Sequence, residues 1–104
     1  MIIVVWKAKI SPGYRSETED LWKRWISYDI KQPEVEDIFV IRPLQGLLYS
    51  KVMAAGRFSS LEGLENFNRR AWEDPEWKAH YKEWMEKDYF NPESMEQYIY
   101  EVIE

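Results

Sequence analysis

The chain has 104 residues, of which 45% are hydrophobic and 32% charged, and we expect one soluble domain, residues 1–104. Its net charge of −5 disfavours a nucleic-acid partner, because binding to phosphates depends on clustered Lys and Arg. The lack of cysteine excludes disulfides and cysteine nucleophiles and, with one histidine, disfavours a structural zinc site. No apolar run approaches the roughly 20 residues of a membrane span, so we expect a cytoplasmic protein without a membrane partner. Many Glu, Lys and Arg with few Asn and Gln are also typical of thermostable proteins.

The first part of the chain predicts a strand followed by a helix. Residues 2–10 (IIVVWKAKI) are rich in Ile and Val and partly alternate, which favours a strand. Ser16 and Glu19 have the spacing of a capping box at the start of a helix, and Gln32-Pro33 ends that helix. The buried stripe of this helix is predicted from residues three and four apart, namely Thr18, Leu21, Trp22, Trp25, Ile26 and Asp29.

The middle of the chain predicts a hairpin and a second helix. Residues 37–44 (DIFVIRPL) favour a strand, and Gln45-Gly46 favours a two-residue turn into a third strand at 47–58. Ser59 and Glu62 repeat the capping-box spacing. The buried stripe predicted for the second helix is Leu61, Leu64, Phe67 and Ala71.

The last part of the chain predicts a restarted helix and a closing strand. Asp74 and Pro75 are typical of an N-cap and a first-turn proline. Trp77, Tyr81 and Trp84 then follow at the spacing of one buried stripe. Asn-Pro-Glu-Ser at 91–94 interrupts the pattern, and residues 95–103 predict the final strand.

The resulting order is β-α-β-β-α(α)-β, which is the order of an α+β ferredoxin-like fold with helices on one face of a four-stranded antiparallel sheet. With a two-residue turn, Val40 lies opposite Lys51, Ile38 lies opposite Met53, and Arg42 lies opposite Tyr49. The other face of the hairpin then carries Phe39, Ile41, Leu48 and Val52. Because one layer of helices covers only one of two apolar faces, we predict a homodimer in which two sheets pack face to face as an α/β barrel.

The segment GRFSSLEGLENFNRRAWEDPEWKAHYKEW at 56–84 resembles the dimeric α/β-barrel superfamily, most of all its NIPSNAP-type and antibiotic-biosynthesis-monooxygenase-like domains. The resemblance is carried by Phe58 at the end of the third strand, by Phe67 and Trp72 on the next helix, and by the restart at residues 74–77. It implies the fold and the dimer. It also implies a choice of activities: cofactor-free monooxygenases, haem-degrading monooxygenases, muconolactone isomerase-like enzymes and NIPSNAP proteins.

The single histidine raises the question of haem. The resemblance to haem-degrading members implies an axial histidine on the last helix, an asparagine near the first strand and a tryptophan near the end of the third. His80 is close to the first of these positions, but residues 2–10 hold no asparagine, and Phe58 stands where the tryptophan would be. We therefore expect no cofactor and no metal, and His80 is either a structural residue or the polar catalytic group of a metal-free site.

Aromatic side chains supply the material for a pocket between sheet and helices. The candidate ligand-binding residues are Trp6, Trp25, Tyr28, Trp77, Tyr81 and Trp84. The same residues also suit a packed core, because burying one tryptophan stabilises a fold by about 4–6 kcal/mol. A basic floor for an anionic ligand requires that Lys7, Lys9, Arg42 and Lys51 share one face.

Two functions remain open at this stage. One is a small-molecule enzyme, monooxygenase-like or isomerase-like without a cofactor, with His80 as the catalytic candidate and a small aromatic or anionic ligand. The other is a non-catalytic NIPSNAP-like binding or interaction module, in which the aromatic residues serve the core and the interface. The chain lacks the P-loop, G-x-S-x-G and H-E-x-x-H motifs, which excludes nucleotide-dependent and serine-hydrolase chemistry.

Overall fold

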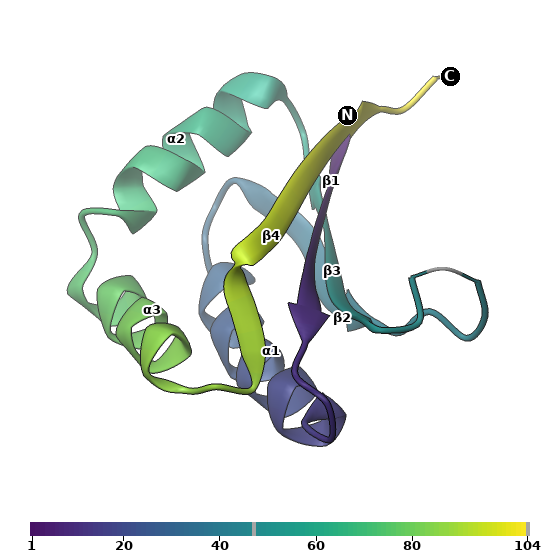
Figure 1. Ribbon diagram of the computed structural model, residues 1–104. Helices are drawn as coiled ribbons and strands as arrows, with labels where there is room; N and C mark the ends of the chain where they lie inside the picture. The colour runs from purple at the N-terminus through teal and green to yellow at the C-terminus, as the bar shows by residue number, and fades with distance from the viewer. Residues whose placement is uncertain (47, 104) are drawn as a thin grey trace.

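The computed structural model describes residues 1–46 and 48–103, so Leu47, the predicted start of the third strand, lies outside the described residues. The elements occur in the predicted order (Figure 1). They are β1 (Ile2–Ile10), α1 (Arg15–Asp29), β2 (Val35–Ile41), β3 (Lys51–Phe58), α2 (Leu61–Ala71), α3 (Pro75–Glu86) and β4 (Phe90–Glu101).

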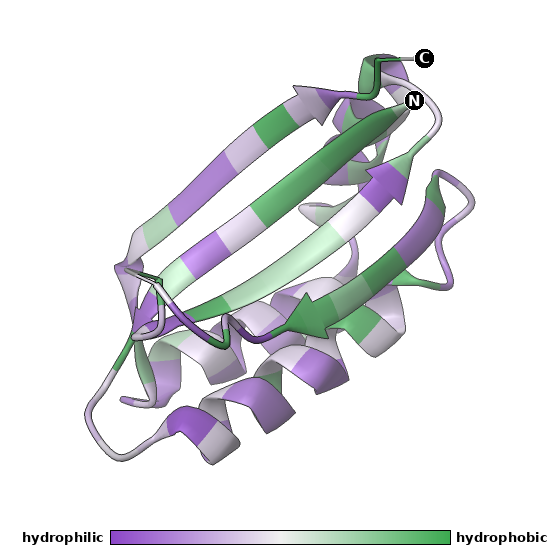
Figure 2. Cartoon of the chain, turned by 90° about the vertical axis from the view of Figure 1, so that its right-hand side faces the viewer, coloured by the Kyte–Doolittle hydropathy of each residue, from purple (hydrophilic) through white to green (hydrophobic). Residues whose placement is uncertain are grey.

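The strands form one antiparallel sheet in the order β2-β3-β1-β4, and the helices all lie on one face of it (Figure 2). This arrangement confirms the predicted α+β ferredoxin-like fold. Burial alternates along the central strand β1, where Val4 and Ala8 are fully buried and Lys9 is exposed. We call the side of the sheet that faces the helices the inner face and the opposite side the outer face.

Tryptophans join the two helices that lie side by side on the inner face. The Trp22 ring on α1 stacks on the Trp84 ring on α3 with centroids 5.1 Å apart, and Trp25 packs against Trp77 at the same centroid distance. All four side chains are buried. At about 4–6 kcal/mol for each ring, this cluster is a major part of the hydrophobic stabilisation of the domain.

The predicted two-residue turn between β2 and β3 is wrong. Ile41 pairs with Met53, Val40 with Ala54 and Ile38 with Gly56, a register three residues away from the predicted one. An odd shift moves every side chain to the other face. Val52 therefore faces the helices together with Ile38 and Val40 instead of sharing a face with Phe39.

A longer connection replaces the tight turn, because β2 ends at Ile41 and β3 begins only at Lys51. Arg42, the first residue of this connection, leaves the sheet and forms an ion pair with Glu19 on α1. Gly46 adopts a φ of +96°, which favours glycine, but it does so within the long connection.

Both predicted capping boxes are misplaced, by two residues for α1 and by one residue for α2. α1 begins after Tyr14, which provides no side-chain cap, and Ser16 lies inside the first turn. Glu19 does not reach back to the helix start, because its carboxylate is bonded to Arg15 and Arg42. α2 is capped by Ser60, whose Oγ accepts from the Gly63 N–H at 3.0 Å. A run of two serines gives the sequence no means to choose between them.

The restart at Asp74 and Pro75 is confirmed. The Asp74 Oδ1 accepts from the Glu76 N–H at 2.8 Å, and Pro75 is the first residue of α3. The other oxygen of Asp74 accepts from the buried Tyr28 hydroxyl at 2.6 Å, which ties α1 to the corner between α2 and α3. This hydrogen bond also lowers the pKa of Asp74.

The closing strand begins earlier than predicted, at Phe90 instead of residue 95. The Asn-Pro-Glu-Ser segment belongs to the strand and forms an irregularity, since the pairing with β1 shifts between Lys7 and Lys9. The Ser94 hydroxyl accepts the Lys9 N–H at 2.8 Å in this region. Because β4 is an edge strand, a proline is tolerated in it.

The fully buried Thr18 joins the start of α1 to the segment between α3 and β4. Its Oγ1 lies 2.6 Å from the carbonyl oxygen of Tyr14 and 2.8 Å from that of Tyr89. We expect Thr18→Val to lower the free energy of unfolding by about 1–2 kcal/mol, because a nearly isosteric methyl group leaves a buried carbonyl without its donor. Denaturant unfolding measures the change. The exposed hydroxyl of Ser27 is the control: Ser27→Ala should have almost no effect, and equal losses would refute this role of Thr18.

Candidate functional site

A cavity of about 330 Å³ lies between the inner face of the sheet and the helices. Every helix and every strand contributes to its wall. All six tryptophans of the chain line it: Trp6, Trp22, Trp25, Trp72, Trp77 and Trp84. The tryptophan rings of the hydrophobic core therefore also belong to the wall of the cavity.

The local sequence explains how the rings reach the cavity. Trp22 and Trp25 are one turn apart on the buried side of α1, and Trp77 and Trp84 are two turns apart on α3. Trp6 comes from the inner face of β1, and its ring crosses the neighbouring strand over Gly56. A Cβ at Gly56 would lie 3.1 Å from the Trp6 ring, so glycine permits this close approach.

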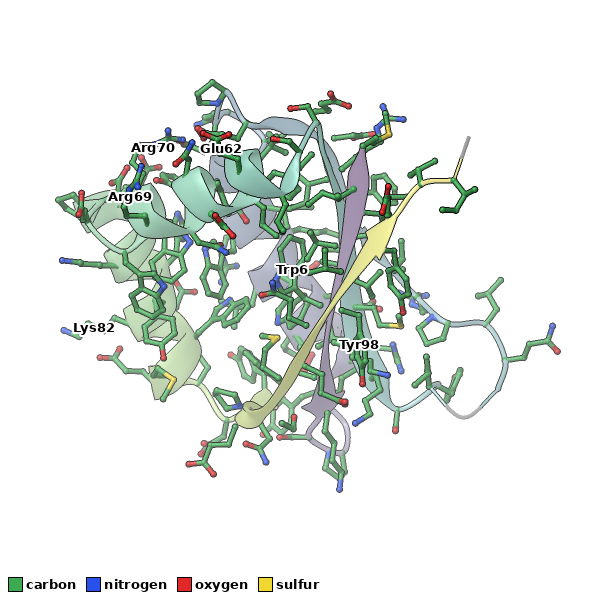
Figure 3. The ribbon with its side chains drawn as sticks, turned by 90° about the horizontal axis from the view of Figure 1, so that it is seen from above. Trp6, Glu62, Arg69, Arg70, Lys82 and Tyr98 are labelled. Carbon is green, nitrogen blue, oxygen red and sulfur yellow. The ribbon has the colours of Figure 1, made fainter. Side chains whose placement is uncertain are left out.

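The mouth of the cavity lies between the α2–α3 corner and β4. Trp72, the C-cap residue of α2, lines the cavity and is 53% exposed. Gln97 on β4 also lines it and is exposed, and its side-chain oxygen accepts from the Trp6 indole N–H at 3.3 Å. In Figure 3 the Trp6 side chain lies on the helix side of the sheet, whereas Tyr98 lies on the other side.

One acidic side chain belongs to the cavity wall. Asp29, the last residue of α1, lines the cavity, and its Oδ1 is buried without a hydrogen-bond partner among the described residues. Burial raises the pKa of Asp29 from 3.8 to about 7. The indole nitrogens of Trp22, Trp25 and Trp84 are likewise buried and unpaired in the described part of the chain. An apolar cavity with a few unpaired polar groups is the usual form of a small-molecule site.

The structure brings together five of the candidate site residues, and two lie elsewhere. Trp6, Trp25, Trp77, Tyr81 and Trp84 line the cavity. Tyr28 is absent from the wall, and its hydroxyl is bonded to Asp74. His80 is also outside the wall, partly exposed, with its ring 6.4 Å from the Tyr28 ring. His80 is the chain's one histidine and lies outside the wall, so it is not placed to serve as the axial histidine that the resemblance to haem-degrading proteins implies.

Trp22, Trp72 and Asp29 line the cavity but were not predicted from the sequence as site residues. Asp29 carried a usable signal, since it is an acidic residue on the predicted buried stripe of its helix. Trp72 carried a weaker one, because it immediately precedes the helix restart. Trp22 could not be distinguished from an ordinary core residue.

The basic side chains do not form a floor for an anionic ligand in the cavity. Lys9 and Lys51 are paired neighbours on the outer face, and Lys7 lies on the same face, 4.7 Å above the Tyr98 ring. Arg42 is bonded to Glu19, and this bond lowers the pKa of that carboxyl. Within residues 1–46 and 48–103, no three His, Asp or Glu side chains are grouped to hold a metal ion, and no helix is long and apolar enough to cross a membrane.

No protein-family model and no curated protein matches the sequence. The structure is similar to a NIPSNAP-domain protein from Burkholderia xenovorans, with a TM-score of 0.77, 14% identity and coverage of 99% of this chain and 95% of that one. It is similar to a variant of SnoaB, a cofactor-independent oxygenase from Streptomyces nogalater, with a TM-score of 0.70, 14% identity and coverage of 99% and 93%.

A third similar structure is a candidate antibiotic biosynthesis monooxygenase from Deinococcus radiodurans, with a TM-score of 0.72, 10% identity and coverage of 100% and 94%. Identities this low show the fold alone. The chain therefore has the ferredoxin-like fold of the NIPSNAP-type and antibiotic-biosynthesis-monooxygenase-like proteins, as the resemblance of its sequence implies.

The buried carboxyl predicts a distinct pH dependence of stability. Because the pKa of Asp29 is higher in the folded chain than in the unfolded one, the folded state binds the proton more tightly, and stability falls as pH rises from about 4 to about 7. We expect Asp29→Asn to remove this fall and to raise the free energy of unfolding above pH 7 by about 2–4 kcal/mol. Urea unfolding across this range measures it. Parallel curves for the two proteins would show that Asp29 has an ordinary pKa.

Proposed function

We propose that this chain forms a homodimer in which each copy binds an aromatic or otherwise apolar small molecule in its tryptophan cavity. The observation that carries the proposal is the convergence of all six tryptophans on one cavity with a mouth to solvent. Its volume of about 330 Å³ suits a small ligand, since ligand pockets are usually about 300–1,000 Å³. A chain that used these rings only for packing would be expected to close the space between them.

The outer face of the sheet supports the dimer. In the observed register its apolar residues come from all strands: Ile3, Val5, Phe39, Ile41, Met53, Ala55, Tyr98 and Tyr100. Phe39 is 48% exposed and Tyr100 is 53% exposed, although both are large and partly apolar. The helices lie on the inner face, so a second copy packed against the outer face would remove these side chains from water.

The proposal leaves two alternatives for the cavity: it either catalyses a reaction of the bound molecule or only binds it. A cofactor-free monooxygenase or an isomerase needs a group that accepts a proton from the bound substrate, and in this cavity Asp29 is better placed for that role than His80. A NIPSNAP-like binding module needs no such group. SnoaB is a cofactor-independent oxygenase, and its similar fold supports the first alternative; the NIPSNAP-domain protein supports the second.

The dimer can be tested with a charge on the outer face. We expect Phe39→Glu to convert the protein to monomers, because it places a carboxylate in the apolar contact between sheets. Light scattering after size-exclusion chromatography measures the mass. Leu61→Glu is the matched control, since Leu61 is 49% exposed but lies on α2, away from the outer face. A wild-type protein that is already monomeric would contradict the proposed dimer.

The cavity can be tested by filling it. Ala54 lines the cavity from β3, and Ala54→Leu adds side-chain volume there, so we expect at least tenfold weaker binding of naphthol measured by calorimetry. The control is Ala79→Leu on the exposed side of α3, which should bind like the wild type. Circular dichroism verifies that both variants fold. Equal binding by all proteins would place the bound naphthol outside the cavity.

A further inference from the structure

We infer that the natural ligand of the tryptophan cavity is an organic amine, whose positively charged nitrogen pairs with the Asp29 carboxylate while its apolar part lies against the indole rings. This inference rests on the proposed binding function and specifies the chemical class of the ligand.

The first ground is the position of Asp29. Its side chain lies in the cavity wall, and Oδ1 has no partner in the part of the chain that the structure describes. A buried carboxylate is costly unless a positive group pairs with it. Arg70, which is near the neighbouring Tyr28, does not serve this purpose, because Glu34 and Gln32 hold its guanidinium.

The other charged groups around Tyr28 do not neutralise Asp29 either. Asp74 at the α2–α3 corner is itself acidic and is bonded to the Tyr28 hydroxyl. His80 on α3 lies beside the Tyr28 ring and outside the cavity wall. Arg24, on the same helix as Asp29, is engaged with Glu83 on α3. When Asp29 is ionised, the cavity therefore holds a negative charge that a bound cation can compensate.

The second ground is the aromatic composition of the cavity wall. The face of tryptophan attracts cations more strongly than that of any other side chain, and six tryptophans line this cavity. An ammonium group on an apolar molecule is attracted by both the carboxylate and the rings. An anion would be repelled by Asp29, and a neutral apolar molecule would leave the carboxylate unpaired.

The inference also bears on the choice between enzyme and binding module. A carboxylate that holds an ammonium group is not free to accept a proton from a substrate. Amine binding through Asp29 therefore agrees better with the non-catalytic alternative than with a monooxygenase or isomerase that uses Asp29 as its base.

Three probes with the same phenylbutyl body test the inference: phenylbutylamine, phenylbutanol and phenylbutyrate. Calorimetry is carried out on the full chain at about pH 8, where Asp29 is ionised and the amine is still protonated. We expect the amine to bind at least tenfold more tightly than the alcohol and the carboxylate probe not to bind. Asp29→Asn should reduce amine affinity at least tenfold, to about that of the alcohol for the wild type.

Asp20→Asn is the control, because Asp20 is also on α1 but its side chain is 68% exposed. It should bind all probes like the wild type. Equal binding of amine and alcohol, or amine binding that survives Asp29→Asn, would overturn the amine inference and leave the proposed cavity function intact. Failure of all probes at millimolar concentration would contradict both.

Discussion

The packing of tryptophans between α1 and α3 is the contact on which the rest of the structure depends. Trp22 and Trp25 meet Trp77 and Trp84, and these rings also form much of the layer between the helices and the sheet. Indoles are large, flat and rigid, and they pack edge to face or offset rather than filling space evenly. Small residues such as Ala54 face the rings across the cavity, where a larger side chain would fill the space.

The polar groups around this core differ in whether they have a hydrogen-bond or ion-pair partner. Where α1 meets the α2–α3 corner, Tyr28 and Asp74 satisfy one another, and at the start of α1 the buried Glu19 is held by Arg15 and Arg42. Asp29 is different, because its burial is not compensated among the described residues and destabilises the fold at neutral pH. A group that costs stability is more easily understood as part of a binding site than as part of the core.

Local patterns predicted the element order, the helix restart at Asp74 and Pro75, and the tryptophan stripes of both helices. Local patterns did not predict the register of β2 and β3, because a long connection joins these strands instead of the two-residue turn that Gln45-Gly46 favours. Five of the fifteen residues that line the cavity were predicted as aromatic site residues. Its acidic member was not: Asp29 belongs to the predicted buried stripe of α1, but only the placement of α1 against the sheet and the other helices shows that it lines a cavity.

We propose that the tryptophan core is also a ligand site. The most direct test is a nitrogen–proton NMR spectrum of protein labelled in tryptophan, titrated with naphthol. The chain's six tryptophans each give one indole N–H signal. We expect the signals of Trp25, Trp77 and Trp84 to shift together and to saturate at one ligand concentration. If no indole signal moves at millimolar naphthol, the tryptophans form a core and nothing more.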